Sequence, residues 1–400
     1  MSFAVGVTLF ALGIAISIAL HEAGHLWAAK AFGMRVRRYF IGFGPRIFSF
    51  RRGETEYGLK AIPAGGFCDI AGMTALDDVA PHEEERAFYR KPTWQRVVVL
   101  SAGSVMHFVI GLVLIYVVAV GWGLVEIRDD AAVGTVSCAA DQVSAQEFAP
   151  CGPGVPAPAA DAGLRPGDVI VSVAGVPIET WEDAVLAIRD ARGPTELVVE
   201  RDGQAVPVVV DVAAAQRLDP QTGAAFTVGA IGVAPVPPTL TDHGVLDGIP
   251  ATFAYTGGLF VDIAERILEL PERIPALFEA IAGGERDENT PVSVIGASII
   301  GGDLAERERW VEFVFLLAVL NFFVGVFNLL PLLPLDGGHI VVNLYERVRD
   351  WTRSRLGKPQ MPPVDYTKLL PITFGLIIVG GAFSLLVLTA DIINPIRLPD

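Results

Sequence analysis

Residues 3–27 read FAVGVTLFALGIAISIALHEAGHLW, and this stretch decides the fold class. The apolar run Phe3–Leu20 leads directly into His21-Glu22-Ala23-Gly24-His25. A helix rises about 1.5 Å per residue, so about 20 apolar residues cross the roughly 30 Å hydrocarbon core of a bilayer. The start lacks a basic segment and no small-residue cleavage pattern follows, so a cleaved signal peptide is not favoured. We therefore expect residues 1–29 to form a retained membrane span with ionisable side chains inside it.

Three further apolar blocks lie at residues 97–125, 310–336 and 369–391. Over 400 residues the chain is 52% hydrophobic and only 19% charged, which excludes a disordered chain. Three cysteines exclude a small disulfide scaffold, and a net charge of −15 argues against nucleic-acid binding, which needs a basic face. The sequence predicts a multi-pass α-helical membrane protein with four transmembrane helices.

The loop charges predict how these spans are oriented. Residues 30–96 carry 12 Lys and Arg against 8 Asp and Glu, and residues 337–368 carry 6 against 3. Residues 126–310 carry 11 against 29. Because positively charged loops stay in the cytoplasm, the first and last of these segments are expected inside and the long acidic one outside. Both chain termini are then outside the cell.

The connecting segments predict two folded parts besides the spans. Within residues 30–96, Val36–Phe50 and Glu54–Phe67 read as strands joined by Arg51-Arg52-Gly53, a β-hairpin rich enough in apolar residues and glycine to dip into the membrane. Outside, residues 131–233 read as a small α+β domain with a capping box at Thr180. Residues 243–309 follow as an amphipathic helical region, which lies on the membrane surface or packs on the small domain.

The three cysteines divide between the two sides of the membrane. Cys138 and Cys151 fall in the outer segment, where a disulfide can persist, and we expect them to close the loop between them. Cys68 falls on the cytoplasmic side and is expected to stay reduced.

The pattern HExxH at residues 21–25 points to a metal site. On a helix, residues four apart lie on one face, so His21 and His25 can bind one Zn²⁺ ion together. The adjacent Glu22 can then act as general base towards a water at the metal. The alternative is three buried side chains satisfied by neighbours, but ionisable groups inside a span are costly and mark functional sites.

A catalytic zinc needs a third protein ligand, and the stretch NLLPLLPLDGGH at residues 328–339 offers one. Asp336 and His21 both fall near the cytoplasmic ends of outside-to-inside helices, so we expect Asp336 to be the ligand rather than a helix-end carboxylate. His339 is assigned a supporting role. We favour a substrate-binding role for Asn328, and leave Asn321 open between that role and a bond to another helix.

These motifs resemble those of a known family. HEAGH in the first span and NLLPLLPLDGGH in a late one resemble the site-2 proteases, the M50-type intramembrane zinc metalloproteases. The segment GLRPGDVIVSVAG at residues 163–175 resembles a PDZ domain inserted between the central spans, the order of the regulator-of-sigma-E branch. The stretches RRYFIGFGP at residues 37–45 and NPIRL at residues 394–398 look closest to the actinobacterial member.

The resemblance implies a zinc endopeptidase of the bacterial plasma membrane, with its active site near the cytoplasmic face. It implies zinc ligation by His21, His25 and Asp336, with Glu22 as the base. The substrates implied are single-span membrane proteins, usually anti-sigma factors already trimmed outside the cell, with the extracytoplasmic PDZ region excluding untrimmed ones. The hairpin, including Gly65-Gly66-Phe67, would hold the substrate as an extended strand.

One feature departs from the family, and three other functions compete with this interpretation. The second span has Gly103-Ser104-Val105-Met106-His107 where the family often has Gly-Pro-x-x-Asn. The same chemistry would also serve to clear remnant signal peptides. An inactive PDZ-bearing membrane adaptor would lack a ligand or the base, and all four residues are present. A metal transporter would need polar residues strung across the bilayer, whereas here they cluster at one depth.

Overall fold

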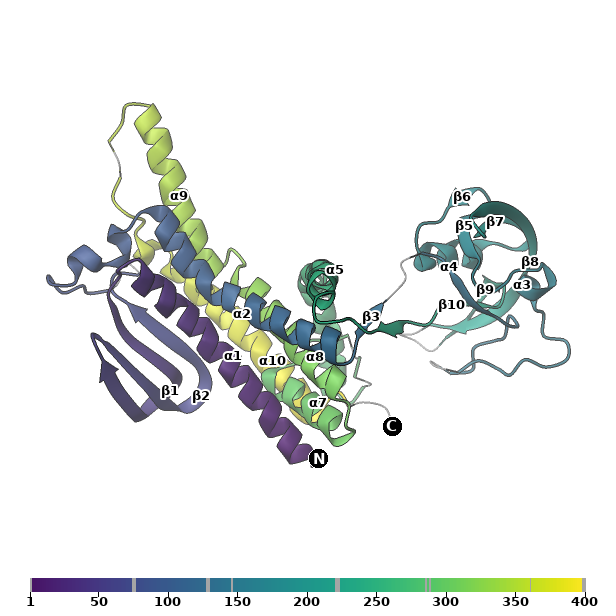
Figure 1. Ribbon diagram of the computed structural model, residues 1–400, viewed down its shortest axis with the longest axis horizontal. Coiled ribbons are helices and arrows are strands. Elements are labelled where there is room, and N and C mark those ends of the chain that lie inside the picture. The colour runs from purple at the N-terminus through teal and green to yellow at the C-terminus, as the bar shows by residue number, and fades with distance from the viewer. Residues whose placement is uncertain are drawn as a thin grey trace. The chain divides into compact units, whose positions relative to one another are not determined.

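The structure is a computed structural model that describes residues 2–73, 77–126, 130–144, 147–219, 224–284, 286–287, 289–359 and 361–397. The chain divides into two compact units. The first combines Met1–Trp122 with Asp242–Asp400, and the second is Gly123–Thr241. Each unit is described by itself (Figure 1).

Four helices of the first unit are long and apolar enough to cross a membrane. They have mean hydropathies between 2.2 and 2.4, and they are α1 Phe3–Ala31, α2 Thr93–Gly121, α8 Trp310–Asn328 and α10 Leu370–Ile393. The prediction of four apolar spans is confirmed at the level of length and composition. Figure 1 shows that α1 begins and α10 ends at the same end of this helical bundle.

The third apolar block differs from its expected bounds. The helix α8 ends at Asn328, whereas we expected the span to run to residue 336. Pro331 and Pro334 lack an N–H and cannot continue an α-helix, so the chain between the two helices is irregular. A separate helix, α9, then spans Asp336–Arg355 within the segment expected to be a loop.

The helix α2 lies at the centre of this unit. It contacts α1, α8 and α9, and it also contacts α5. The approach to α1 is close, because a Cβ at Gly24 would overlap the carbonyl oxygen of Ala102. Small residues at a helix interface allow backbones to approach in this way.

The region expected to be amphipathic packs on these helices. It contains α5 Gly248–Glu269, the short turn η3 Leu270–Arg273, α6 Ile274–Ile281 and α7 Val294–Glu306. The helix α5 packs on α2 and α8, while α6 packs on α10 and α7 packs on α1. We expected this region either on the membrane surface or packed on the small domain. Packing against the spans was not expected.

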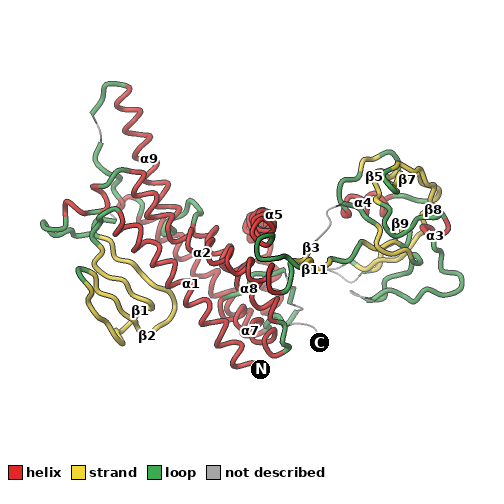
Figure 2. The backbone as a smooth tube through the Cα atoms, viewed as in Figure 1, coloured by secondary structure: helices red, strands yellow, loops and turns green. Residues whose placement is uncertain are grey.

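The hairpin consists of β1 Val36–Arg52 and β2 Thr55–Ile70, and Figure 2 shows both strands strongly bent. Each strand folds back so that four segments pair in the order 46–52, 55–60, 36–41 and 66–70. The segment 66–70 is therefore at an edge of this small sheet, and β2 contacts α1.

Ion pairs link the base of the hairpin to the turn η1 Glu84–Arg86, which the turn η2 Phe88–Arg90 follows. The Glu54 carboxylate accepts hydrogen bonds from Arg86 at 2.7 Å and from Arg35 at 2.6 Å. These two guanidinium groups lower the pKa of Glu54 to about 2. The Glu54 carboxylate is therefore charged near pH 7, where it can pair with both arginines.

The second unit is an α+β fold around one five-stranded sheet, in the order β6-β5-β7-β8-β9. Its capping box is present as expected, since Thr180 accepts from the Asp183 N–H at the start of α4. The strand pair β3 with β11 lies outside the expected residues 131–233, and β10, which pairs with β4, runs past them to Pro235. The elements are β3 Leu124–Glu126, β4 Val133–Val136, α3 Pro158–Asp161, β5 Val169–Val173, β6 Val176–Pro177, α4 Trp181–Asp190, β7 Gly193–Arg201, β8 Gln204–Leu218, β9 Ala225–Ala230, β10 Val233–Pro235 and β11 Thr239–Thr241.

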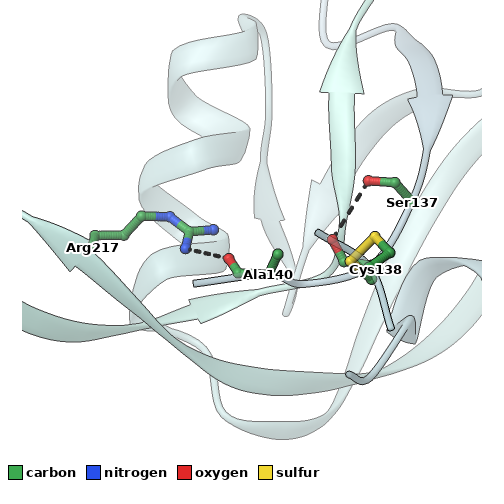
Figure 3. The surroundings of a disulfide bond; sticks show 5 residues. Ser137, Cys138, Ala140 and Arg217 are labelled. Carbon is green, nitrogen blue, oxygen red and sulfur yellow. Dashed lines mark hydrogen bonds between the residues drawn. A yellow bond between two sulfur atoms is a disulfide. The ribbon is translucent and has the colours of Figure 1, made fainter. Parts of the chain in front are cut away.

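A disulfide joins Cys138 to Cys151 in this unit, with 5.8 Å between their Cα atoms. Figure 3 shows Arg217 beside it, donating a hydrogen bond to the Ala140 carbonyl at 2.9 Å. The Arg217 guanidinium also lies over the Phe148 ring, 5.1 Å from its centroid. The loop between the two cysteines is thus held both covalently and by β8. Cys68, by contrast, is a free thiol.

Replacing both Cys138 and Cys151 by Ser is expected to lower the free energy of unfolding of the second unit by about 3 kcal/mol. A disulfide that closes a loop of this size removes about that much conformational freedom from the unfolded chain. Thermal unfolding of the purified full-length protein, with and without dithiothreitol, measures the effect. The reductant should lower the midpoint of the native protein and leave that of the variant unchanged. An equal response of both proteins would contradict the prediction.

Candidate metal centre

Two helices distant in sequence bring three metal-binding side chains together. His21 and His25 lie one turn apart on the same face of α1, and both are buried. Asp336 is the first residue of α9, where a carboxylate is also stabilised by the helix N-terminus. The two Nε2 atoms are 3.2 Å apart, and each lies 3.4 Å from Oδ2 of Asp336.

These distances fit a tetrahedral zinc ion. With zinc-to-nitrogen and zinc-to-oxygen distances of about 2.0–2.2 Å, tetrahedral ligand atoms lie about 3.3–3.5 Å from one another. Imidazole and carboxylate are both common zinc ligands, and three protein ligands leave a fourth position open, as in catalytic sites. No other group of three such residues in the described part of the chain meets the same distance criterion.

The outer nitrogen of one imidazole is fixed by the backbone of α2. Nδ1 of His25 lies 2.7 Å from the carbonyl oxygen of Val99, so it donates its proton there and leaves Nε2 free to bind a metal. Nδ1 of His21 is buried and has no partner among the described residues. The bond from His25 to the Val99 carbonyl could not be predicted from the sequence, because any residue type supplies a backbone carbonyl.

Glu22 lies between the two histidines in sequence and faces the hairpin. The Cβ that an alanine at Gly66 would add lies 2.9 Å from Cγ of Glu22, so the edge segment of β2 runs directly beside this carboxylate. The neighbouring Phe67 ring stacks on Phe40, with centroids 5.6 Å apart. The structure therefore brings Gly66 beside Glu22, and the substrate-binding role expected from the resemblance for Gly65, Gly66 and Phe67 stays a prediction.

Gly103 on α2 allows the imidazoles to sit against that helix. A Cβ there would lie 2.5 Å from both Cε1 of His21 and Nε2 of His25. No real Cβ contact is that short, so any side chain at this position must displace one ring or both. Gly103 was noted in the sequence only as part of a motif, and its close approach to both imidazoles was not predicted.

Replacing Gly103 by Ala is expected to lower zinc affinity and proteolytic activity by more than about 100-fold. The added methyl group moves the ligands themselves, and even changes to groups that only orient ligands cost about 10–100-fold. Zinc content after dialysis against a chelator, measured by mass spectrometry, checks the first effect. Gly121→Ala is the matched control, since that glycine ends the same helix with nothing nearby. Full zinc in the Gly103 variant would contradict the prediction.

A second polar pair lies behind the metal centre. Nδ1 of the buried His107 lies 2.9 Å from Oδ1 of Asn321, and the His107 ring is 5.0 Å from that of His21. Asn321 donates its Nδ2 to the Leu317 carbonyl, so Oδ1 accepts the proton of His107. Of the two roles left open for Asn321, the structure shows the bond to another helix.

Asn328 lies elsewhere. It is the last residue of α8 and is partly exposed, and among the described residues its side chain makes no hydrogen bond. The substrate-binding role favoured for it stays a prediction.

His339 lies one turn beyond Asp336 but outside the ligand set. Its Nδ1 is 3.3 Å from the Tyr366 hydroxyl, and the two rings stack with centroids 5.7 Å apart. Burial lowers the pKa of His339 and raises the pKa of Tyr366 to about 12, so both side chains are neutral near pH 7. The pair holds the start of α9 against the segment that leads to α10.

Comparison with known proteins gives a consistent result. The model of peptidase family M50 matches residues 9–361. The zinc metalloprotease Rip1 of Mycobacterium tuberculosis is 49% identical over 410 residues, and Rip1 of Mycolicibacterium smegmatis is 48% identical over 407, each covering all of both chains. The metalloprotease MmpA of Caulobacter vibrioides is 29% identical over 366 residues, 85% of each chain.

The family match covers most of the chain, including α1, α9 and the helices between them. The Rip1 relatives extend that likeness over the full length of the chain. Their names specify zinc, and the two imidazoles and the carboxylate at α1 and α9 are common zinc ligands. The chain therefore belongs to peptidase family M50, the site-2 proteases, and is a zinc-dependent intramembrane endopeptidase.

Proposed function

We propose that His21, His25 and Asp336 hold the zinc ion and that Glu22 is the general base of peptide hydrolysis. The observation that carries this proposal is the convergence of three ligand atoms at 3.2–3.4 Å from two distant helices. Zinc in such a site polarises a carbonyl and lowers the pKa of a bound water. Glu22, next to His21 and facing the hairpin, takes the water's proton and passes it to the leaving amine.

The hairpin is proposed to hold the substrate. Segment 66–70 pairs with another strand only on the side of segment 36–41, and Gly66 touches Glu22. A substrate unwound from its helix can add to this edge as an extended strand, which places its peptide bonds beside the base. Gly65, Gly66 and Phe67 would contact it, and the small glycines leave room for its backbone.

The orientation is proposed from the charges and the bundle together. α1 begins and α10 ends at one end of the bundle, as both termini outside the cell require (Figure 1). The metal ligand His21 lies about 27 Å along α1 from Phe3, about two-thirds of the way to the opposite end of the helix. The acidic second unit is extracytoplasmic in this orientation, where its disulfide can persist.

We also propose that the second unit is a PDZ-like gate for trimmed substrates, anti-sigma factors in particular. A cavity of about 450 Å³ lies between α4 and the segment from β9 to β10, and the disulfide loop lines it too. Trp181 and Ile188 of α4 form one wall, and Ile231 and Val233 form the opposite one. A groove between a helix and a strand suits an extended peptide.

Cleavage in liposomes tests the proposal. The full-length protein is reconstituted with a single-span anti-sigma factor, either intact or trimmed to a short extracytoplasmic stub. Trimmed substrate should be cut within its span and intact substrate should not, and added zinc chelator should stop the reaction. Equal cutting of both would overturn the gate, and cutting outside the span would overturn the assignment of the site.

A further inference from the structure

A second cavity in the first unit lies close to the metal centre. It has a volume of about 200 Å³ and is formed where five stretches of chain meet. These are the turn after β2, the turn η2, the start of α2, the middle of α9 and the segment that leads into η4 Tyr366–Lys368. Its lining includes none of the proposed zinc ligands, nor Glu22, nor any residue of the hairpin strands.

The walls of this cavity are mostly apolar. Phe88 and Tyr366 contribute rings, and Met73 and Val364 contribute aliphatic side chains. A volume of this size accommodates one leucine- or phenylalanine-sized side chain, and burial of such a side chain is favourable by about 1.5–3 kcal/mol.

Two polar atoms of its lining residues are buried and lack partners. Asn343 is 4% exposed, and its Nδ2 donates to the His339 carbonyl at 2.8 Å, but no described residue reaches its Oδ1. Arg96 donates through Nη1 to Glu346, yet its Nε is buried without an acceptor. Both side chains line the cavity, and leaving such atoms unsatisfied is costly, so a ligand in the cavity can satisfy them once the two side chains turn towards it. One free acceptor and one free donor complement the N–H and C=O of a peptide.

The same two helices connect this cavity to the catalytic residues. Arg96 lies one turn before Val99, whose carbonyl orients His25. Asn343 lies seven residues after Asp336 on α9, about 10 Å along the helix axis. An extended peptide covers about 10 Å in three residues. A substrate held at the zinc can therefore reach the cavity with residues just beyond the cut.

We propose that this cavity is a specificity pocket for the substrate's flank. It takes one apolar side chain of the substrate, three to five residues from the scissile bond, on the side towards α9. The substrate backbone donates an N–H to Oδ1 of Asn343 and offers a C=O to Nε of Arg96. This inference rests on the proposed function, because it names a further part of the substrate that the same site binds.

Cleavage kinetics test the pocket with a synthetic single-span peptide in liposomes. The peptide carries Phe or Gly at the flank positions, and Val364→Trp fills the cavity of the enzyme. The native enzyme should show a KM about tenfold lower for the Phe peptide, with similar kcat, as one buried side chain predicts. Val364→Trp should lose this preference. Val348→Trp, at an exposed position of α9 outside the cavity, should keep it.

Asn343→Leu separates a ligand-binding amide from a structural one. It removes the unpartnered acceptor, so it should not lower thermal stability by much, while it raises KM for the Phe peptide about tenfold. An unchanged KM would mean that water alone satisfies this atom, and would overturn the proposal. Equal KM values of the native enzyme for the Phe and Gly peptides would overturn it as well.

Cross-linking keeps this test separate from that of the proposed function. A photo-crosslinking amino acid at position 364 of the Glu22→Gln enzyme should capture the flank of the bound peptide, and one at position 348 should not. Capture needs no cleavage. If no peptide is cleaved but the cross-linker at position 364 still captures it, the result counts against the proposed chemistry alone. Equal capture at positions 364 and 348 would overturn the pocket.

Discussion

Glu22→Gln is expected to lower cleavage of a trimmed single-span substrate by about 10²- to 10⁴-fold while zinc stays bound. The amide has nearly the shape of the carboxylate but cannot accept a proton from water, and general-base catalysis contributes about that factor. None of the three ligand atoms belongs to Glu22, so the metal centre should remain intact. The loss should appear in kcat rather than in KM, since the base acts in the transition state.

Single-turnover cleavage in liposomes, with zinc measured in the same samples, decides this prediction. Glu312→Gln is the matched control, because Glu312 lies at the start of α8 and, among the described residues, pairs with Arg309 alone. Equal cleavage by the Glu22 variant and the native enzyme would remove Glu22 as the base. Loss of zinc together with activity would show that Glu22 supports the metal instead.

Asp336→Asn is expected to lower zinc affinity by more than about 100-fold and to abolish cleavage. Asp336 supplies the one anionic oxygen of the donor set, at 3.4 Å from both imidazole nitrogens. An amide oxygen is neutral, so two neutral imidazoles would be left to hold a divalent ion. The expected loss exceeds the 10- to 100-fold typical of changes to groups that only support a ligand.

Competition with a fluorescent zinc chelator measures this affinity in detergent. Asp350→Asn is the control on the same helix, where Asp350 pairs with Arg349. Rescue of the Asp336 variant by millimolar zinc would agree with a weakened ligand. Zinc affinity equal to that of the native protein would leave the third ligand unassigned.

The parts that depend on local pattern were predictable from sequence. HExxH places His21 and His25 together because residues four apart share a helix face, and the spans follow from apolar length. Asp336 was proposed as the third ligand because its depth along the spans matches that of His21, and the structure brings the three side chains together. The disulfide partners followed from the charge-derived topology, which placed only Cys138 and Cys151 outside.

The parts that depend on tertiary approach were not predictable. The Val99 carbonyl orients His25 through the backbone, and the closeness of Gly103 to both imidazoles depends on how α1 packs on α2. The break between α8 and α9 had a local signal in Pro331 and Pro334, although we expected one span over residues 310–336. From the sequence a substrate-binding role was favoured for Asn328 and the role of Asn321 was left open, and only the packing of α2 on α8 places Asn321 on His107.

X-ray absorption at the zinc edge, on the purified full-length enzyme, tests the central claim most directly. The account predicts one zinc per chain with only nitrogen and oxygen neighbours at about 2.0–2.2 Å, including two imidazoles. The imidazole signal should fall in a His25→Ala variant loaded with zinc. A sulfur neighbour, or an unchanged spectrum in that variant, would place the zinc elsewhere and contradict the assignment of the site.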